Sequence, residues 1–213
     1  MKSAAAMKKV LHLSFSPHGA TTRGYDLARR AIANLSEAQP GIHLTERDVA
    51  TSTLPHMQPA YASAITSLSP HSSPAFQSSE ELISELQESH YLVISTPMHN
   101  FTVPASFKLW IDYVVRKGRT FTTQAGGYKV GMLEDRPALV VVSSGGTHSG
   151  EDARQPDFLS PYVTHILETI GIKDVRFIYL QGMSRPETAA QSIAVAGEML
   201  ASDPVFGEAV AAL

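Results

Sequence analysis

Short apolar runs alternate with helix-patterned segments along almost the entire chain, and this alternation restricts the fold more than any other feature of the sequence. Runs at 10–14, 91–95, 138–142 and 175–180 have the length of buried strands, whereas residues 42–49 alternate in polarity as an edge strand does. Segments with apolar residues at helical spacing lie between these runs. Strands that alternate with helices in this way predict a parallel sheet covered by helices on both faces.

The predicted helices carry recognisable start and stop residues. Thr22 has the chemistry of an N-cap for the first helix. Ser79 is predicted to cap a helix over residues 80–89, and Pro104 to open the next helix, where its missing N–H is not needed. The remaining expected features are a loop or hairpin at Gly126-Gly127, a helix over 161–170 that Gly171 ends, and a helix over 189–200.

Five strands connected in this way predict a flavodoxin-like α/β fold, with a five-stranded parallel sheet in the order 2-1-3-4-5. The length of 213 residues suits a single domain, residues 1–213. Residues 51–79 contain no Asp, Glu, Lys or Arg and are rich in Ser, Thr, Pro and Ala, so we interpret them as a long loop with a short helix near 61–65. A functional role for this loop and a plain surface excursion both remain open.

Composition narrows the classes of function. A net charge of −3 argues against nucleic acid or an anionic membrane as the main partner, because both favour a positive protein surface. The absence of cysteine excludes disulfides, cysteine-ligated metal sites and a thiol nucleophile. No apolar run reaches the roughly 18 residues of a membrane-spanning helix, and the histidines show no metal-ligand spacing. We therefore expect a cytoplasmic protein without a bound metal.

Three segments rich in glycine and small polar residues each follow a predicted strand directly. They cover residues 16–24, 97–101 and 143–146, after the first, third and fourth strands. In the predicted order these strands are neighbours, and their carboxyl ends lie at the topological switch point, where open parallel sheets bind ligands. We therefore expect the three segments to meet in one site.

The residue types in these segments predict a flat, phosphorylated ligand. Residues 16–24 lead into a helix N-terminus, which favours phosphate through its free N–H groups and its dipole, although plain helix capping explains the same residues. Gly145 and Gly146 would let a planar ring approach the backbone, while Asn100 and Phe101 would add amide donors and an aromatic edge. Flavin mononucleotide (FMN) is the natural candidate for such a ligand. The first segment is neither a dinucleotide fingerprint nor a P-loop.

Several motifs resemble those of the FMN-dependent NADH-azoreductases, bacterial flavoproteins that also reduce quinones. The resemblance covers about residues 9–196 and rests on Met98-His99-Asn100-Phe101 with Pro104 and 108–112, on Thr120-Phe121, on Ser143-Ser144-Gly145-Gly146 with His148, and on 171–175. It implies a flavodoxin-like homodimer with FMN near the dimer interface, which reduces quinones and azo compounds with NADH in a ping-pong reaction. The cofactor-binding positions of the family fall on Ser16, Thr22, Arg23, Gly24, Met98, His99, Asn100, Phe101, Ser143, Ser144, Gly145 and Gly146.

The resemblance also assigns roles to two residues outside these segments. Phe121 is expected to wall the substrate pocket, and His148 either to help protonate the reduced substrate or to be a solvated loop residue. His99 stands where many relatives have Tyr, and Thr169 where many have an aromatic residue, which bears on substrate preference. Thr22-Arg23-Gly24 replaces a frequent Ser-x-Ser, so Arg23 would compensate for a lost hydroxyl.

Two other functions remain as alternatives. A flavodoxin-type electron carrier would share the fold, although such carriers are usually markedly acidic. A phosphodiesterase-type hydrolase would use Ser143 or Ser144 as nucleophile and His148 as base. The sequence contains no G-x-S-x-G elbow and no identifiable carboxylate to orient such a base.

Overall fold

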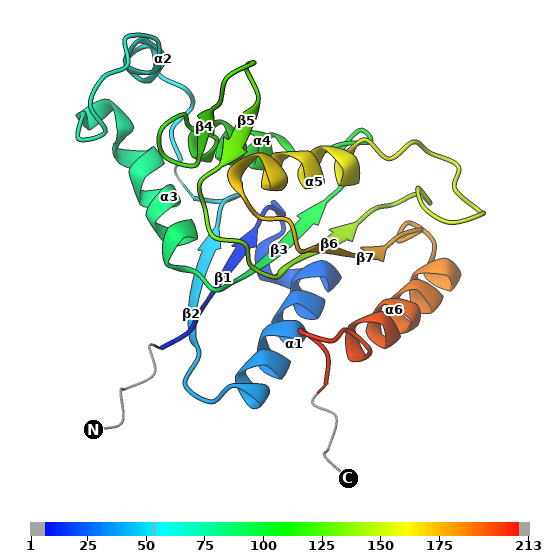
Figure 1. Cartoon of the computed structure of the whole chain (residues 1–213). Coiled ribbons are helices and arrows are strands. Elements are labelled where there is room, and N and C mark those ends of the chain that lie inside the picture. The colour runs from blue at the N-terminus through cyan, green and yellow to red at the C-terminus, as the bar shows by residue number, and fades with distance from the viewer. Residues whose placement is uncertain (1–6, 53, 209–213) are drawn as a thin grey trace, which may run out of the picture.

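The computed structural model describes residues 7–52 and 54–208, and a five-stranded parallel sheet forms its centre (Figure 1). The terminal residues of the expected domain 1–213, and Thr53 in the segment 51–79, lie outside the described residues. The sheet has the order β2-β1-β3-β6-β7, so the predicted flavodoxin-like strand order is confirmed. Its strands are β1 (Lys9–Ser14), β2 (His43–Asp48), β3 (Tyr91–Pro97), β6 (Ala138–Ser143) and β7 (Val175–Leu180).

The sheet is covered on both faces by helices, as predicted (Figure 1). Helices α1 (Arg23–Ala38) and α6 (Pro186–Ala201) cover one face, and α3 (Gln77–Glu88), α4 (Ala105–Val114) and α5 (Leu159–Ile170) cover the other. Side chains alternate between the two cores along each strand, so Val10 packs beneath α1 while Leu11 packs beneath α3 and α4.

The central strands are buried on both faces, which explains their apolar sequences. Nearly every residue of β1, β3 and β6 is buried, whereas the edge strand β2 has no fully buried residue and carries the polar sequence HLTERD. The core beneath α4 is aromatic: the rings of Phe15 and Phe107 stack at 4.0 Å, and Trp110 meets Phe15 edge-on at 6.0 Å. Trp110 is therefore a core residue.

The segment 51–79 contains more regular structure than the sequence predicts. Helix α2 (Pro59–Thr66) confirms the expected short helix and extends it, and a 3-10 turn, η2 (Pro74–Phe76), leads directly into α3. The expectation that Ser79 caps α3 is wrong, because the helix begins at Gln77 and Ser79 lies inside its first turn. The Ser79 hydroxyl donates to the Tyr113 carbonyl at 2.6 Å and accepts from Arg116, so it fastens α3 to the end of α4.

A two-stranded hairpin lies above α5 in Figure 1. Strands β4 (Phe121–Thr123) and β5 (Lys129–Gly131) pair in antiparallel fashion, and Gly126 and Gly127, both with positive φ, form the turn between them. Gly171 ends α5 as predicted, with φ +114°, and a Cβ there would lie 2.4 Å from the Leu133 carbonyl oxygen. The hairpin predicted at Gly126-Gly127 is confirmed.

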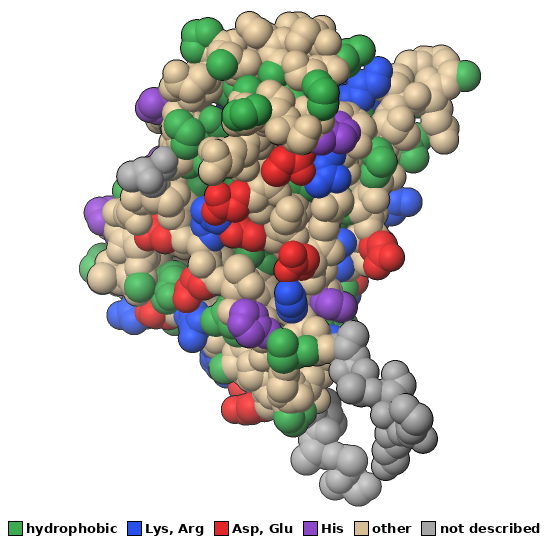
Figure 2. All heavy atoms as spheres, turned by 90° about the vertical axis from the view of Figure 1, so that its left-hand side faces the viewer, with side chains coloured by type: hydrophobic (Ala, Val, Ile, Leu, Met, Phe, Trp, Pro, Cys, Tyr) green, Lys and Arg blue, Asp and Glu red, His purple; other side chains and the backbone are tan. Residues whose placement is uncertain are grey.

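Acidic and basic side chains are interspersed over the face that carries α3 (Figure 2). Arg47 of β2 pairs with Glu81 and Glu85 of α3, and Glu80 pairs with Arg116 and Arg119. Such mixing gives this face no patch of a single charge sign. No helix among the described residues is long and apolar enough to cross a membrane, and these residues contain no cluster of three potential metal ligands from His, Cys, Asp and Glu.

Candidate functional site

A cavity of about 820 Å³ opens at the carboxyl ends of β3, β6 and β7. Three loops build it: β3–α4, β6–α5 and β7–α6. Two of these loops are the second and third segments that the sequence predicts to meet, and the structure brings them together. The residues that line the cavity are Met98, Asn100, Phe101, Ser144, Gly145, Gly146, Thr147, Asp152, Arg154, Gln155, Gly182, Ser184, Arg185 and Thr188.

The β3–α4 loop is a tight turn that holds two residues in an unusual backbone conformation. The backbones of His99 and Thr102 exchange two hydrogen bonds, of 2.9 and 3.0 Å. Between them Asn100 and Phe101 have φ values of +47° and +71°, as a type I′ turn requires. A bulky residue such as Phe rarely adopts a positive φ, and such strain gathers at functional sites. Phe101 is 43% exposed and lines the cavity, so the turn leaves this residue accessible to solvent.

The β6–α5 loop begins with a turn that lies against the β7–α6 loop. The Ser144 amide donates to the Leu180 carbonyl at 2.8 Å, and the Gly182 amide donates to the Gly146 carbonyl at 3.0 Å. These bonds continue the pairing of β6 with β7 beyond the sheet. A Cβ at Gly146 would lie 1.9 Å from the Gln155 side-chain nitrogen, so the Gln155 side chain packs over this glycine and would have to move to admit another residue. The turn therefore offers a flat strip of backbone with no side chain at Gly145 or Gly146.

Backbone N–H donors without protein partners gather at these two turns. The amides of Asn100, Phe101, Gly145 and Gly146 donate no hydrogen bond to any described residue. All four of these residues line the cavity. An arrangement of fixed N–H groups suits a ligand with carbonyl oxygens and ring nitrogens.

The first predicted segment lies next to this cavity but does not line it. Ser16 is buried, and its hydroxyl accepts from the His18 amide at 3.2 Å. Thr22 caps α1 by accepting from the Tyr25 amide at 3.3 Å, as predicted. Gly24 touches the third segment, since a Cβ there would lie 2.7 Å from the Ser143 hydroxyl oxygen. Exposed Arg23 lies 3.7 Å from Asp26 of the same turn.

Phe121 and His148 both lie outside the cavity lining. Phe121 is buried in the hairpin, with the Lys129 ammonium 4.9 Å from its ring centre. The alternative of a solvated His148 is wrong, because this side chain is 4% exposed and meets the Tyr179 ring edge-on at 5.0 Å. Burial lowers the pKa of His148, and the carboxylate of Asp157, 3.7 Å away, opposes this shift only in part.

A chain of polar groups, which starts at the buried His12, ties the first turn of α1 to the sheet. His12 is fully buried, and its two ring nitrogens lie 2.9 Å from Glu46 and 3.1 Å from the Ser95 hydroxyl. Tyr25 donates to the same Glu46 oxygen at 2.7 Å, and Arg29 lies 3.5 Å from this carboxylate. Burial lowers the pKa of His12 although the hydrogen bond to Glu46 acts in the opposite direction.

The sequence analysis missed the cavity wall formed by the β7–α6 loop and by residues 152–155. Gly182 and Ser184 follow β7 in the same manner as the other small polar residues follow their strands, so the same rule would have found them. Gln155 carries no comparable sequence signal, because its contact with Gly146 depends on how a loop folds back.

Comparison with known proteins identifies the family. The profile of a family described as having a flavodoxin-like fold matches residues 8–202. The chain belongs to this family. A relative from Pseudomonas fluorescens, named FMN-dependent NADH:quinone oxidoreductase 4, is 45% identical over 207 residues, which are 97% of this chain and 100% of that protein. FMN-dependent NADH:quinone oxidoreductase 5 from Burkholderia lata is 47% identical over 187 residues, or 88% and 91% of the two chains.

Solved structures share the same flavodoxin-like fold. An azoreductase from Bacillus anthracis superposes with a TM-score of 0.79 at 22% identity, covering 91% of this chain and 96% of that chain. An FMN-dependent NADH-azoreductase from the same species, solved in complex with FMN, gives a TM-score of 0.77 at 20% identity, covering 91% and 97%. The family resemblance predicted from the sequence motifs is confirmed.

Proposed function

We propose that this protein is an FMN-dependent oxidoreductase that uses NADH to reduce quinones and aromatic azo compounds. The observation that carries the proposal is the cavity at the carboxyl ends of β3, β6 and β7. It is lined by Asn100, Phe101, Gly145 and Gly146, whose amides have no partner among the described residues, in a chain that is 45% identical to an FMN-dependent NADH:quinone oxidoreductase over 97% of its length. Because NADH is the proposed donor, we also propose a cytoplasmic location.

The residues around the cavity fit an isoalloxazine ring. Gly145 and Gly146 leave a strip of backbone without side chains, and the cavity volume of about 820 Å³ accommodates a flat ring together with a second planar molecule. The free amides at Asn100 and Gly145 match the carbonyl and ring-nitrogen acceptors of a flavin. We propose that Met98, His99, Asn100, Phe101, Ser143, Ser144, Gly145 and Gly146 bind the ring and the ribityl chain.

The phosphate end of the cofactor has a separate candidate site at the start of α1. Thr22 caps this helix, whose first turn offers N–H groups and the positive end of the dipole. Gly24 touches Ser143 of the ring-binding segment, which brings the two sites next to each other. We propose that Ser16, Thr22, Arg23 and Gly24 bind the phosphate. The positive charge of exposed Arg23 would compensate for the hydroxyl that a second serine supplies in many relatives.

The protein's own contribution to the reaction is binding, orientation and charge stabilisation. FMN, when bound, supplies the hydride-transfer chemistry between donor and acceptor. The fixed amides of Asn100, Phe101, Gly145 and Gly146 would stabilise negative charge on the ligand without having to reorient. We propose that donor and acceptor occupy the exposed side of the cavity in turn. His148 is buried and does not line the cavity, and burial lowers its pKa, so we assign it no direct proton transfer.

We further propose that the active form is a homodimer. Phe101 is 43% exposed and Phe158 is 60% exposed, and the Phe158 amide donates to the Phe101 carbonyl at 3.0 Å, so the two lie together beside the cavity. Exposed apolar groups of this size favour contact with another protein surface. Light scattering should show a dimer, and Phe158→Glu should shift the protein toward monomer; a monomeric wild type would contradict this part of the proposal.

The cofactor and the activity have a direct test. Purified protein should show the absorption bands of oxidised FMN, and NADH should bleach them without oxygen. Gly145→Leu should lose FMN while keeping the fold, because a Cβ at this position has its first neighbour only at 3.7 Å. Gly197→Leu in α6 is the matched control, since its Cβ would first meet Arg30 at 3.6 Å, away from the cavity. Colourless wild type that takes up no FMN would refute the proposal.

Turnover separates this proposal from its alternatives. An electron carrier would not oxidise NADH with a quinone as sole acceptor, and a hydrolase would act without flavin. The structure gives the hydrolase no support, because neither Ser143 nor Ser144 bonds to a ring nitrogen of His148 among the described residues.

A further inference from the structure

Two arginines without partners face the same cavity. The chain contains ten arginines, and the guanidinium groups of eight bond to a carboxylate or a backbone carbonyl. The two others, Arg154 and Arg185, form no ion pair or side-chain hydrogen bond with any residue that the structure describes. Both line the cavity, Arg154 from the β6–α5 loop and Arg185 from the β7–α6 loop.

Hydrogen bonds connect the backbone of both arginines to the turn that contains Gly145 and Gly146 (the glycine turn). The Arg154 amide donates to the Thr147 carbonyl at 3.0 Å, and the Arg185 amide donates to the Gly182 carbonyl at 3.3 Å. Gly182 is itself bonded to Gly146 at 3.0 Å. The turn on which the flat ring is proposed to lie therefore also holds the backbone of both arginines in place.

The cavity is consequently positive in a protein that is negative as a whole. Its charged lining consists of Arg154, Arg185 and Asp152, whereas the chain has a net charge of −3. A guanidinium group binds phosphate, carboxylate and sulfonate through paired N–H donors, and an arginine with no internal partner keeps all of these donors for a ligand.

We propose that Arg154 and Arg185 form an anion-binding rim of the cavity. This rim selects donors and acceptors whose reactive planar ring carries an acidic group, either directly or through a linker. This inference rests on the proposed function and adds a substrate class to it. The acidic group has two sources with the same chemistry: the diphosphate of the nicotinamide dinucleotide, and a carboxylate or sulfonate on the acceptor. Both sources are compatible with one rim, because donor and acceptor are proposed to use the cavity in turn.

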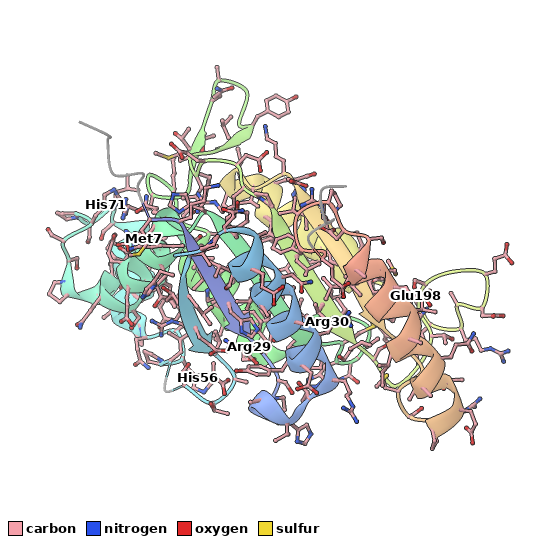
Figure 3. The ribbon with its side chains drawn as sticks, turned by 90° about the horizontal axis from the view of Figure 1, so that it is seen from below. Met7, Arg29, Arg30, His56, His71 and Glu198 are labelled. Atoms are coloured by element: carbon pink, nitrogen blue, oxygen red, sulfur yellow. The ribbon has the colours of Figure 1, made fainter. Side chains whose placement is uncertain are left out.

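The test compares Arg154→Gln, Arg185→Gln and the double variant with Arg30→Gln as the control. Arg30 lies on the α6 side of α1, opposite Arg29, and pairs with Glu208 at 2.5 Å, outside the cavity (Figure 3). Steady-state kinetics of each holoenzyme are measured with NADH, with a neutral quinone, and with a quinone of the same ring that carries a carboxylate. FMN content is determined first by absorbance.

Each cavity variant should raise the KM of an anionic ligand about fivefold, and the double variant should raise it by more, at nearly unchanged kcat. The KM of the neutral quinone should stay at the wild-type value. A rise for NADH alone identifies the dinucleotide diphosphate as the occupant, and a rise for the carboxylated quinone alone identifies the acceptor. Added salt should raise the same KM in the wild type and much less in the double variant.

A binding measurement supplies a second readout. Calorimetric titration of the oxidised holoenzyme with a planar carboxylate that is not reduced should give a lower affinity in the double variant, while the corresponding neutral amide should bind equally well to both proteins. Equal affinities of the double variant and of Arg30→Gln for the carboxylate, with equal KM values for NADH and the acidic quinone, would overturn the rim.

The outcomes separate the rim from the proposed function. Wild type that binds FMN and oxidises NADH, with a double variant that behaves like Arg30→Gln, refutes the rim alone. Wild type that neither binds FMN nor oxidises NADH refutes the proposed function, and the rim with it. A double variant that folds but has lost FMN also overturns the rim, because the arginines would then hold the cofactor.

Discussion

Acid should destabilise this protein through buried histidines, and His148 is the clearest case. Its side chain is 4% exposed, and neither ring nitrogen has a hydrogen-bond partner among the described residues. Burial lowers the pKa of His148, and Asp157 opposes this shift only in part. The folded protein therefore keeps the ring neutral at a pH at which the unfolded chain already takes up the proton.

The sign and the size follow from this difference in proton uptake. A group whose pKa is lowered by folding stabilises the native state fully above its unfolded pKa, near 6.5, and this contribution is lost as the pH falls. Each proton that only the unfolded chain binds removes about 1.4 kcal/mol per pH unit below that value. At about pH 5.5 the wild type should therefore have lost up to about 1.4 kcal/mol through this one residue.

The substitution His148→Leu should reveal this loss. It removes two unpartnered nitrogens and keeps an apolar contact with Tyr179. Near pH 8 the free energy of unfolding should stay within about 1 kcal/mol of the wild type, because no hydrogen bond is broken. Between pH 8 and pH 5.5 the stability of the variant relative to the wild type should rise by up to about 1.4 kcal/mol, which corresponds to at most about 3–6 °C in Tm for a chain of this length. Urea and thermal unfolding followed by circular dichroism between pH 5 and 8 measure this.

His12→Leu is the matched control, because the same ring there has partners on both sides. Its nitrogens contact Glu46 and Ser95, and their removal leaves these groups without a partner. We expect a loss of about 2 kcal/mol near pH 8, which should shrink in acid since burial lowers the pKa of His12 as well. The reasoning would be wrong if His148→Leu lost the same stability at every pH, or if the two variants were equally stable near pH 8.

Three further substitutions test the fold. Gly171→Ala should lower the free energy of unfolding by more than about 3 kcal/mol, because φ is +114° and the new Cβ would lie 2.4 Å from the Leu133 carbonyl oxygen. Gly41→Ala is the control and should cost about 1 kcal/mol, because φ is +92° but the space around the new Cβ is open. Equal urea midpoints of the two variants would contradict this. Arg136→Met should cost about 2–3 kcal/mol, since this buried guanidinium donates to the Leu86, Ser89 and Glu134 carbonyls; an unchanged Tm would show that these bonds contribute nothing net. Glu46→Gln should lower Tm by about 2–6 °C, because it weakens the hydrogen bonds from Tyr25 and His12 to a half-exposed carboxylate, and a pH-independent effect would argue against a charged Glu46.

The sheet and two walls of the cavity follow from the sequence because they depend on local patterns. Apolar runs with helices between them specify a parallel sheet, and residues that follow a strand directly must lie at its carboxyl end. Thr22 and Gly171 are equally local signals, and both act as predicted. Ser79 shows the limit of such reasoning: a serine before an acidic residue suggests a cap, but the η2 turn starts the helix earlier and the hydroxyl is used 34 residues away, at Tyr113.

The third wall and the anion-binding rim depend on pairings over long distances, which a single sequence does not contain. Arg30 meets a carboxylate 178 residues away and Arg116 meets one 36 residues away, while Arg154 has Glu151 and Asp152 beside it in sequence and pairs with neither. Proximity in sequence therefore does not tell which arginines are neutralised: Arg23 and Arg176 pair with a neighbouring carboxylate, and Arg154 does not. Arg154 and Arg185 can be recognised as unpaired only when the partners of the eight other arginines are known from the structure. Within the described residues, both line the cavity that also contains the glycine turn and the amides without partners.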